Sequence, residues 1–253
     1  MRNEIVAQNV SIEINGRSLL AKCSFSFAEG DIVLLEGNNG IGKTTLLKAM
    51  IGLNDHEVSV QGDIKVGEFD NVVNMQEKEL LNLRSNVAYL GQKDEYESYY
   101  GITVREVLED SLEAHKGKLS TADKQFIEEA FTTYLPKNSG ISLKSKIRKL
   151  SGGQQRIVSI LGSLCLRKDA GIFLVDEPLN NLDIKAIVTI SNILNRIHIE
   201  KPDTLMIIIS HCKIFPFVNT TATIANGKIE VSKSGVVCHA CFGEPDEKGY
   251  YSE

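Results

Sequence analysis

Nine residues, "GNNGIGKTT" at Gly37–Thr45, restrict the possible folds of this 253-residue chain more than any other feature. The pattern G-x-x-x-x-G-K-[ST] of a phosphate-binding loop is met by Gly37, Gly42, Lys43 and Thr44. Such a loop follows a strand and precedes a helix, and the apolar run 31–37 and the periodic segment 43–52 predict both. Its glycines let the backbone approach phosphates, Lys43 supplies positive charge to the β- and γ-phosphates, and the Thr44 hydroxyl ligates Mg²⁺. The sequence therefore predicts a phosphate-binding α/β domain.

Strand and helix signals alternate along the rest of the chain. Apolar runs at 171–178 and 205–211 predict buried strands, and the helical pattern at 184–199 lies between them. This alternation predicts a mostly parallel sheet flanked by helices. Weaker patterns at 58–66, read as edge strands around a glycine turn, and at 221–232 predict an antiparallel β edge.

A small helical lobe is expected in the middle of the chain. Thr103 and Glu106 have the spacing of a capping box at the start of one helix. A second helix follows at 120–135, with Ser120 or Thr121 as its cap. Strand signals resume only at 171, so these helices are expected to form a lobe of their own.

Two acidic residues and a histidine follow predicted strands. Asp176 ends the apolar run "GIFLVD", where an α/β sheet places an acid that holds Mg²⁺, and Glu177 could deprotonate an attacking water. Taken alone, the pair could equally be a solvated acidic turn. His211, after the run at 205–210, could contact the γ-phosphate or the water, or could be an ordinary hydrogen-bonded surface residue.

Composition excludes several other classes of protein. The net charge of −5 argues against a protein that coats nucleic acid, and no nucleic-acid partner is expected. The N-terminus lacks the continuous apolar core of a signal peptide. The longest apolar run, Leu205–Ser210, is far shorter than the ~20 residues of a membrane-spanning helix. These features predict a cytosolic protein that reaches a membrane only through a partner.

Cysteine usage points to a reducing compartment. The chain has five cysteines, an odd number that does not suggest a disulfide framework. Cys238 and Cys241 have C-x-x-C spacing, with His239 between them. One such pair is only half of a zinc site, so free thiols are the simpler interpretation, and metal or redox use is the alternative.

A second segment also has the chemistry of a phosphate-binding end. In "LSGGQQR", Ser151 is followed by two glycines and then by a helical pattern. A serine cap with bare backbone N–H groups behind it can bind an anion at the start of a helix. An ordinary capped helix start is the alternative. One chain thus contains two candidate phosphate-binding ends.

From about Val10 to Ile229 the chain resembles the ATP-binding cassette (ABC) ATPases, because six motifs occur in the family's order and spacing. The first motif resembles the Walker A loop and covers Asn38, Asn39, Gly40, Ile41, Gly42, Lys43, Thr44 and Thr45. Gln92 resembles the Q-loop glutamine, Asp176 and Glu177 resemble Walker B with its catalytic glutamate, and His211 resembles the switch histidine. The signature is Ser151, Gly152, Gly153 and Gln154 after Leu150, and the D-loop runs from Asn180 to Asp183.

The resemblance implies an ATP hydrolase that works as a head-to-tail dimer, in which each signature binds the ATP held by the other subunit. ATP and Mg²⁺ are then its ligands. Lys43, Gln92, Glu177 and His211 would be catalytic, and Thr44, Gln92 and Asp176 would hold Mg²⁺. Asn180 and Asp183 would communicate across the dimer. One departure is Ile14, which lies where the family usually carries the aromatic ring that stacks on adenine.

A single cassette without a membrane segment resembles the separate ATPase subunit of an ABC transporter, peripheral on the cytoplasmic face of the membrane. Residues 1–92 and 150–235 would form the nucleotide-binding core, 93–149 a helical subdomain that receives the membrane subunit, and 236–253 a short tail. Tyr96, Tyr99 and Tyr100 would suit that interface, or would lie half-packed in a surface turn. The alternative function is a soluble ABC ATPase that powers a cytosolic scaffold of the iron–sulfur assembly type.

Overall fold

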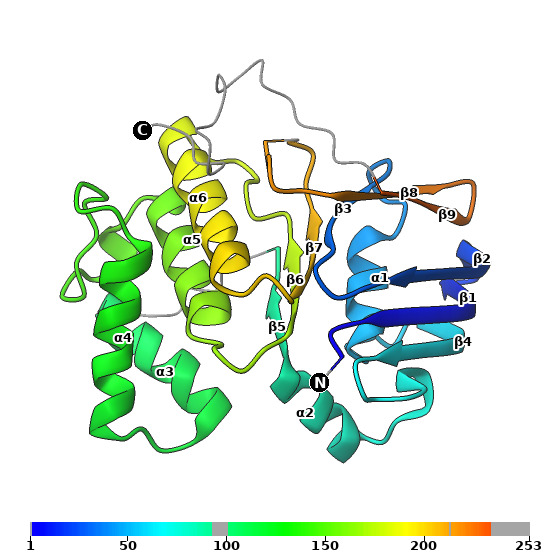
Figure 1. The fold of residues 1–253 in the computed structure, drawn as a ribbon, viewed down its shortest axis with the longest axis horizontal. Coiled ribbons are helices and arrows are strands. Elements are labelled where there is room, and N and C mark those ends of the chain that lie inside the picture. Colours follow the sequence, from blue (N-terminus) through cyan, green and yellow to red (C-terminus); the bar gives the residue numbers. More distant parts are fainter. Residues whose placement is uncertain (1, 93–100, 213, 234–253) are drawn as a thin grey trace. The chain divides into compact units, whose positions relative to one another are not determined.

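The computed structural model describes residues 2–92, 101–212 and 214–233 (Figure 1). Contacts divide the chain into two compact units. The first comprises the described parts of 1–88, 170–177 and 201–238, and the second those of 89–169 and 178–200. Tyr96, Tyr99, Tyr100, Cys238 and Cys241 lie outside the described residues, so the predictions about them stay predictions.

The first unit contains most of the strands. Its strands are β1 (Ile5–Ile14), β2 (Arg17–Phe27), β3 (Ile32–Glu36), β4 (Val58–Val66), β6 (Ile172–Asp176), β7 (Leu205–Ile209), β8 (Thr220–Ala225) and β9 (Lys228–Ser232). Its helices are α1 (Lys43–Met50), the 3₁₀ turn η1 (Val72–Asn74) and α2 (Glu77–Asn86). Strand β5 (Val87–Leu90) begins in this unit and ends in the second.

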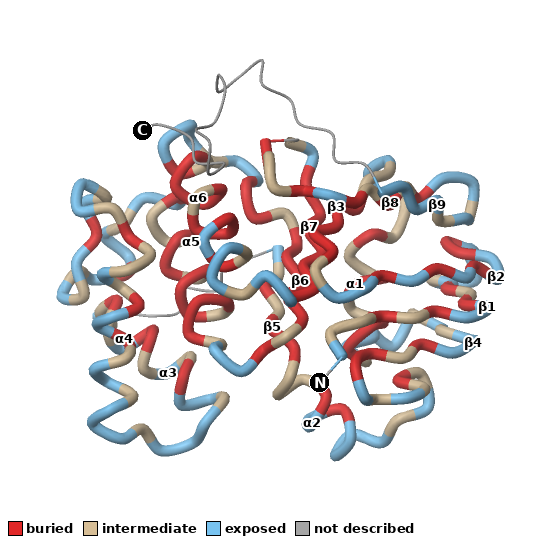
Figure 2. The backbone as a smooth tube through the Cα atoms, in the orientation of Figure 1, coloured by how far each residue is buried: buried red, intermediate tan, exposed pale blue. Residues whose placement is uncertain are grey.

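The larger sheet has the strand order β5-β6-β7-β3-β8-β9 within the described residues. Strands β6, β7, β3 and β8 run parallel, and β9 returns antiparallel to β8. Every residue of β6 and β7 is buried, as Figure 2 shows in red. These strands therefore read as continuous apolar runs, because a parallel sheet is covered on both faces.

A separate antiparallel sheet has the order β2-β1-β4. Asn15 and Gly16, with φ of 50° and 78°, form the two-residue turn between β1 and β2. The turn expected at Gly62 is absent: β4 runs through it as one strand with φ 98°, and a Cβ there would lie 2.5 Å from the carbonyl oxygen of Asn9. Glycine is needed here for a close backbone approach within the sheet rather than for a chain reversal.

The second unit is helical. It contains α3 (Val104–Lys116), α4 (Thr121–Tyr134), the 3₁₀ turn η3 (Ile147–Lys149), α5 (Gly152–Ile160), the π-helical segment η4 (Leu161–Cys165) and α6 (Ile184–Glu200). Thr103 and Ser120 cap α3 and α4 through capping boxes with Glu106 and Asp123. The apolar faces of the helices pack within the unit, and no described helix is long and apolar enough to cross a bilayer.

The predicted fold class is confirmed: the chain has a mostly parallel sheet with an antiparallel edge, a separate antiparallel sheet and a group of helices. Helix α2 was not expected, because its residues are mostly polar, although Gln76 and Glu79 do form a capping box. By contacts, α5 and α6 group with α3 and α4. The boundaries given from the sequence, 1–92 with 150–235, 93–149 and 236–253, stay a prediction about functional modules.

Candidate functional site

Three adjacent strands end level at one edge of the larger sheet. In the order β6-β7-β3, Ile209 is in register with Asp176 on one side and with Leu35 on the other. The phosphate-binding loop follows β3, Glu177 follows β6, and His211 follows β7. Because parallel strands place their carboxyl ends at the same edge, the sheet gathers these residues in the first unit.

Lys43 lies at the base of the phosphate-binding loop. Its Nζ donates to the carbonyl oxygens of Gly37 at 2.8 Å and Asn38 at 3.1 Å, and the residue is only 7% exposed. Burial lowers the pKa of the Lys43 ammonium, whereas the nearby charges of Glu177 and Asp176 raise it. The loop therefore holds one cation folded back on its own backbone, with two carboxylates close by.

The loop ends on a tightly packed glycine. Gly42 caps α1 with φ 103°, and a Cβ there would lie 2.6 Å from Cδ1 of Leu19 on β2. Asn38, Asn39 and Gly40 are exposed to solvent. The loop thus packs on one side against the antiparallel sheet, while its tip faces solvent.

Asp176 and Glu177 differ sharply in their surroundings. Asp176 is fully buried at 0% exposure, and a buried carboxylate requires compensating partners. Glu177 adopts φ +44°, an uncommon conformation for a residue with a side chain, and its N–H donates to the carbonyl of Ile209 at 3.0 Å. The backbone thus bends at Glu177, directly after the strand that contains Asp176.

His211 lies next to Glu177. Its Nε2 is 3.6 Å from Oε1 of Glu177, and its side chain is 55% exposed against 15% for Glu177. Ser210 shapes the turn, because its hydroxyl accepts from the N–H of Cys212 at 3.0 Å and donates to the Cys212 carbonyl at 2.9 Å. The histidine ring is thus held at the open end of the site.

The signature segment, Leu150–Gln154, opens α5 in the second unit. Ser151 is the N-cap, and its hydroxyl accepts from the N–H of Gln154 at 3.3 Å. The Gln154 side chain accepts from the N–H of Ser151 at 3.0 Å and donates to the carbonyl of Ser139 at 3.1 Å. Ser151 and Gly152 are exposed, so the start of this helix faces solvent in the single chain.

Gly153 joins the signature to the predicted D-loop. A Cβ on Gly153 would lie 2.7 Å from Cβ of Ala186 and 3.6 Å from Oδ2 of Asp183. Asp183 accepts from the N–H of Ala186 at 2.9 Å through Oδ1 and so caps α6. Asn180 is exposed in the preceding turn. The starts of α5 and α6 therefore touch, which sequence spacing alone does not reveal.

Arg156 is a buried residue to which the sequence assigned no role. It is 4% exposed, and it donates to the carbonyls of Gly91 at 2.8 Å and Pro178 at 3.4 Å. Gly91 precedes Gln92, which is itself exposed, and Pro178 follows Glu177. One guanidinium thus ties α5 to the chain segments beside two predicted site residues. An arginine inside an otherwise apolar helix face was the available signal.

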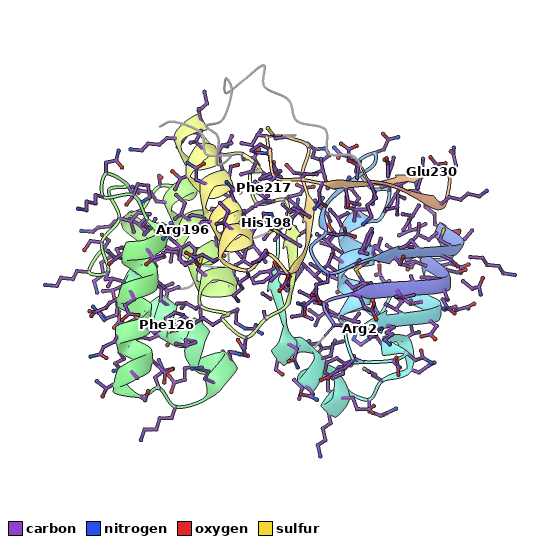
Figure 3. All side chains as sticks on the ribbon, in the orientation of Figure 1. Arg2, Phe126, Arg196, His198, Phe217 and Glu230 are labelled. Carbon is purple, nitrogen blue, oxygen red and sulfur yellow. The ribbon has the colours of Figure 1, made fainter. Side chains whose placement is uncertain are left out.

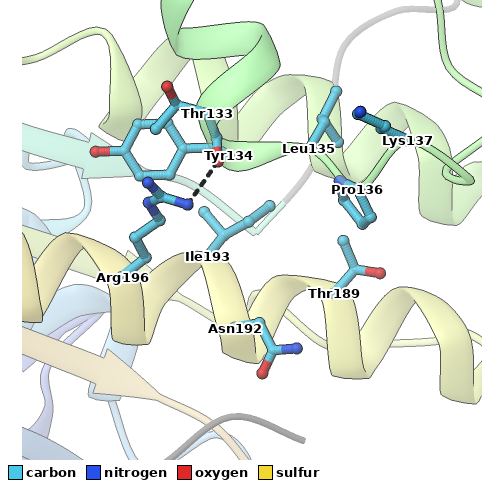
Figure 4. Close-up of a pocket in the computed structure, with 9 residues that line it drawn as sticks. All are labelled: Thr133, Tyr134, Leu135, Pro136, Lys137, Thr189, Asn192, Ile193 and Arg196. Carbon is cyan, nitrogen blue, oxygen red and sulfur yellow. Dashed lines mark hydrogen bonds between the residues drawn. The ribbon is translucent and has the colours of Figure 1, made fainter. Parts of the chain in front are cut away.

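A cavity of about 360 Å³ lies between the end of α4 and the middle of α6 (Figure 4). None of its lining residues is a predicted site residue. Arg196, which extends from α6 (Figure 3), donates to the Thr133 carbonyl at 2.9 Å and pairs with Glu200 at 2.8 Å. The hydroxyl of Tyr134 also bonds to Glu200, and this bond and burial raise the Tyr134 pKa. The cavity has both polar and apolar lining residues, and two of them, Tyr134 and Arg196, bond to Glu200.

The predicted site residues thus divide between the units. Those of the first unit are Asn38, Asn39, Gly40, Ile41, Gly42, Lys43, Thr44, Thr45, Asp176, Glu177 and His211. Those of the second are Gln92, Ser151, Gly152, Gly153, Gln154, Asn180 and Asp183. The described residues contain no cluster of three His, Cys, Asp or Glu side chains that could hold a metal ion.

Comparison with known proteins adds an independent line of evidence about the family of this chain. A family profile described as "ABC transporter" matches residues 20–180. A phosphonates import ATP-binding protein from Fusobacterium nucleatum is 28% identical over 235 residues, which cover 90% of this chain and 92% of that protein. The sn-glycerol-3-phosphate import ATP-binding protein of Brucella abortus is 34% identical over 184 residues, 72% of this chain, and the chain covers 48% of its length.

Solved structures show the same fold. The dimeric post-hydrolysis state of the ATP-binding cassette MJ0796, bound to ADP and Pi, superposes with a TM-score of 0.73 over 90% of this chain and 98% of that one. The two sequences are 21% identical, so this likeness concerns the fold.

Proposed function

The chain belongs to the ABC transporter family, whose profile covers more than half of it at residues 20–180, and we propose that it couples ATP hydrolysis to a separate membrane subunit. The chain is an ATP-binding, ATP-hydrolysing subunit of that family. Membership of this family favours coupling to a membrane subunit over the cytosolic-scaffold alternative. The chief support for ATP hydrolysis at this site is the meeting of Lys43, Asp176 and Glu177 at one sheet edge.

ATP would bind with its phosphates on the loop at Gly37–Thr45. The Lys43 ammonium would leave the carbonyls of Gly37 and Asn38 and contact the β- and γ-phosphates. The charges of Asp176 and Glu177, and then of the phosphates, favour its protonated form against the cost of burial. Exposed N–H groups from Asn38 to Thr45 and the N-terminus of α1 would bind the remaining phosphate oxygens.

The residues present fit a Mg²⁺ ion. A fully buried Asp176 carboxylate and the hydroxyl of Thr44 in the phosphate-binding loop match the preference of Mg²⁺ for few protein oxygens plus phosphate. Gln92 would add its side-chain oxygen. When bound, the ion would neutralise charge that develops on the phosphates. These three assignments are part of the proposal.

Glu177 would act as the general base. Its carboxylate would accept a proton from water while the water oxygen attacks the γ-phosphorus, and the bond to the β–γ bridging oxygen would break to leave ADP. His211, 3.6 Å from Glu177, would contact the γ-phosphate and fix the carboxylate. The bend at φ +44° supports this role, because strained backbone concentrates at functional sites.

Two chains would complete each other's sites. Ser151 and Gly152 are exposed at the start of α5, and Gly153 and Gln154 follow within its first turn. A helix start of this kind suits the γ-phosphate of ATP held by a second copy, and a two-fold axis makes two such sites from one surface. Asp183, beside Gly153, and Asn180 in the preceding turn would couple the two sites of the dimer.

Glu177→Gln tests the catalytic assignment. It should keep ATP binding, abolish turnover and give an ATP-dependent dimer, because only the base is lost. Size-exclusion chromatography with light scattering measures the ATP-dependent dimer, and a phosphate-release assay measures turnover. Glu68→Gln, an exposed acid in the same unit, is the matched control and should behave as wild type. Turnover near the wild-type rate in Glu177→Gln would remove Glu177 as the base.

Complementation tests the shared site. Ser151→Arg should impair hydrolysis with little effect on ATP binding by the monomer, and Lys43→Ala should lose ATP binding. Mixed in equal amounts, the two inactive proteins should regain about a quarter of wild-type activity, because half of the dimers are mixed and each has one intact site of two. Activity no higher than the sum of the separate variants would contradict binding in trans.

The membrane partner is the third element of the proposal. Both relatives compared above are named as import ATP-binding proteins, which supports import as the direction and the cytoplasmic face of a membrane as the location. The helical subdomain at 93–149 is the proposed docking region. Tagged Glu177→Gln with ATP should recover a multi-span protein from solubilised membranes. Recovery of soluble scaffold proteins alone would support the alternative function.

A further inference from the structure

The phosphate-binding loop contains an Asn-Gly pair, Asn39–Gly40, and the sequence repeats this pair at Asn15–Gly16 and Asn226–Gly227. An asparagine before glycine can react spontaneously, because glycine has no side chain to shield its backbone nitrogen. The glycine nitrogen attacks the asparagine side-chain carbonyl carbon, a five-membered imide forms and ammonia leaves. Water then opens the imide at either carbonyl, and the product is aspartate or isoaspartate.

Two of the pairs are fixed in β-hairpins. Asn15 and Asn226 have φ of 50° and 51°, and the glycines that follow them have φ of 78° and 72°, the signature of two-residue turns closed by paired strands. Asn15 is held further, because its Nδ2 donates to Oε2 of Glu57 at 2.9 Å. Ring closure requires a change in the asparagine backbone and side chain, which these contacts oppose.

Asn39–Gly40 is held far less firmly. Asn39 is exposed, as Asn15 and Asn226 are, but it lies outside any turn between paired strands and is not among the residues with positive φ. The hydrogen bond that spans the pair runs from the Ile41 N–H to the Asn38 carbonyl at 3.2 Å. Among the described residues, the Asn39 side chain and the Gly40 N–H have no hydrogen-bond partner.

We propose that Asn39–Gly40 is a site of spontaneous deamidation that inactivates the empty phosphate-binding loop and that bound ATP protects. The bare Gly40 N–H that suits a phosphate is also the nitrogen that attacks the Asn39 side chain. A bound phosphate would accept that N–H and restrain the loop. The ATP part of this inference rests on the proposed function, whereas the reaction of the empty loop does not.

The reaction would stop nucleotide binding for two reasons. Aspartate at position 39 adds a negative charge where phosphates bind, and like charges at short range repel. Isoaspartate inserts an extra carbon into the backbone and displaces the N–H groups that follow it. Loss of ATP binding should therefore track the modified fraction of Asn39.

Peptide mapping by mass spectrometry of the full chain, incubated at mildly alkaline pH, measures all three pairs in one sample. In the folded, nucleotide-free protein, Asn39 should react several-fold faster than Asn15 and Asn226, and in urea the three rates should converge. In Glu177→Gln with Mg-ATP at a hundred times its Kd, about 1% of loops stay empty, so the Asn39 rate should fall by up to about 100-fold. The other two rates should not change.

Variants separate the consequences. Asn39→Ser should hold its own initial ATP binding through the incubation, whereas Asn15→Ser, the matched control, should lose binding as fast as wild type. Fresh Asn39→Asp should bind ATP more weakly than wild type. The proposal is overturned if Asn39 reacts no faster than the hairpin pairs in the folded chain, or if Asn39→Asp binds ATP normally. If fresh protein binds no ATP, the proposed function fails, and the rates of the empty protein still decide the deamidation.

Discussion

Replacing Gly153 by alanine tests whether the signature helix α5 touches the start of α6. The added Cβ would lie 2.7 Å from Cβ of Ala186, whereas non-bonded carbon atoms pack at about 3.5–4.0 Å. One helix must therefore move. Overpacking of this kind costs about 1–3 kcal/mol, and alanine in place of glycine in a helix regains about 0.5–1 kcal/mol. We expect a net loss of about 1–2 kcal/mol in the free energy of unfolding.

Two further variants isolate the cause. Gly152→Ala, one residue earlier, meets no atom within 4 Å and should be neutral or slightly stabilising, because it adds only helix propensity. Ala186→Gly removes the atom that the new Cβ would meet. The double variant Gly153→Ala/Ala186→Gly should therefore be more stable than the two single effects predict, with a coupling of about 1–2 kcal/mol.

Urea unfolding of the nucleotide-free protein, followed by circular dichroism, measures these differences. In thermal unfolding, a loss of 1 kcal/mol in the free energy of unfolding should lower Tm by about 2–4 °C in a chain of this size. The m-value should stay unchanged if only the folded state is affected. If Gly153→Ala is as stable as Gly152→Ala and shows no coupling to Ala186→Gly, the two helices do not touch as described.

Three other predictions concern single residues. Arg156→Met should destabilise the chain by about 1–3 kcal/mol, because the carbonyls of Gly91 and Pro178 lose their buried donor; unchanged urea unfolding would contradict this. Ser151→Ala should lower the free energy of unfolding by about 1 kcal/mol, because the N-cap of α5 is lost, and should also lower ATPase activity. An unchanged Tm would show that the Ser151 hydroxyl does not stabilise the helix. Lys116 and Ser120 lower the pKa of Asp123 below 3.8, the ordinary value for aspartate. The Asp123 carboxylate therefore stabilises the fold fully above pH 3.8, and this stabilisation is lost as the pH falls below that value. Asp123→Asn should thus lower Tm at neutral pH, with a difference that shrinks on acidification; a difference independent of pH would refute this.

Residues with a strictly local role were predictable from the sequence. Thr103 with Glu106, and Ser120 with its helix, are capping residues because of bonds within one turn. The phosphate-binding loop was likewise predictable from the spacing of its residues, since glycine, lysine and threonine each meet a local requirement. The carboxyl ends of β3, β6 and β7 followed from the apolar runs before them, because parallel strands share one edge.

Features that depend on contact between distant segments could not be predicted from the sequence. Gly62 was read as a turn, and its true reason is the carbonyl of Asn9 on the neighbouring strand. Helix α2 was missed because tertiary packing of Leu80 and Leu83, rather than a strong apolar pattern, stabilises it.

By itself the sequence determined the family, the order of the motifs and the N-terminal caps of α3 and α4, because caps and motif spacing are properties of neighbouring residues. Only the tertiary structure decided which residues touch across the chain: Gly153 with Ala186, Arg156 with Gly91, and Leu19 with Gly42. It also decided that Glu57 holds the Asn15 side chain while the Asn39 side chain has no hydrogen-bond partner among the described residues, although both precede glycine. The physical reason is that burial and packing depend on how close segments come in space, and sequence separation does not encode that distance.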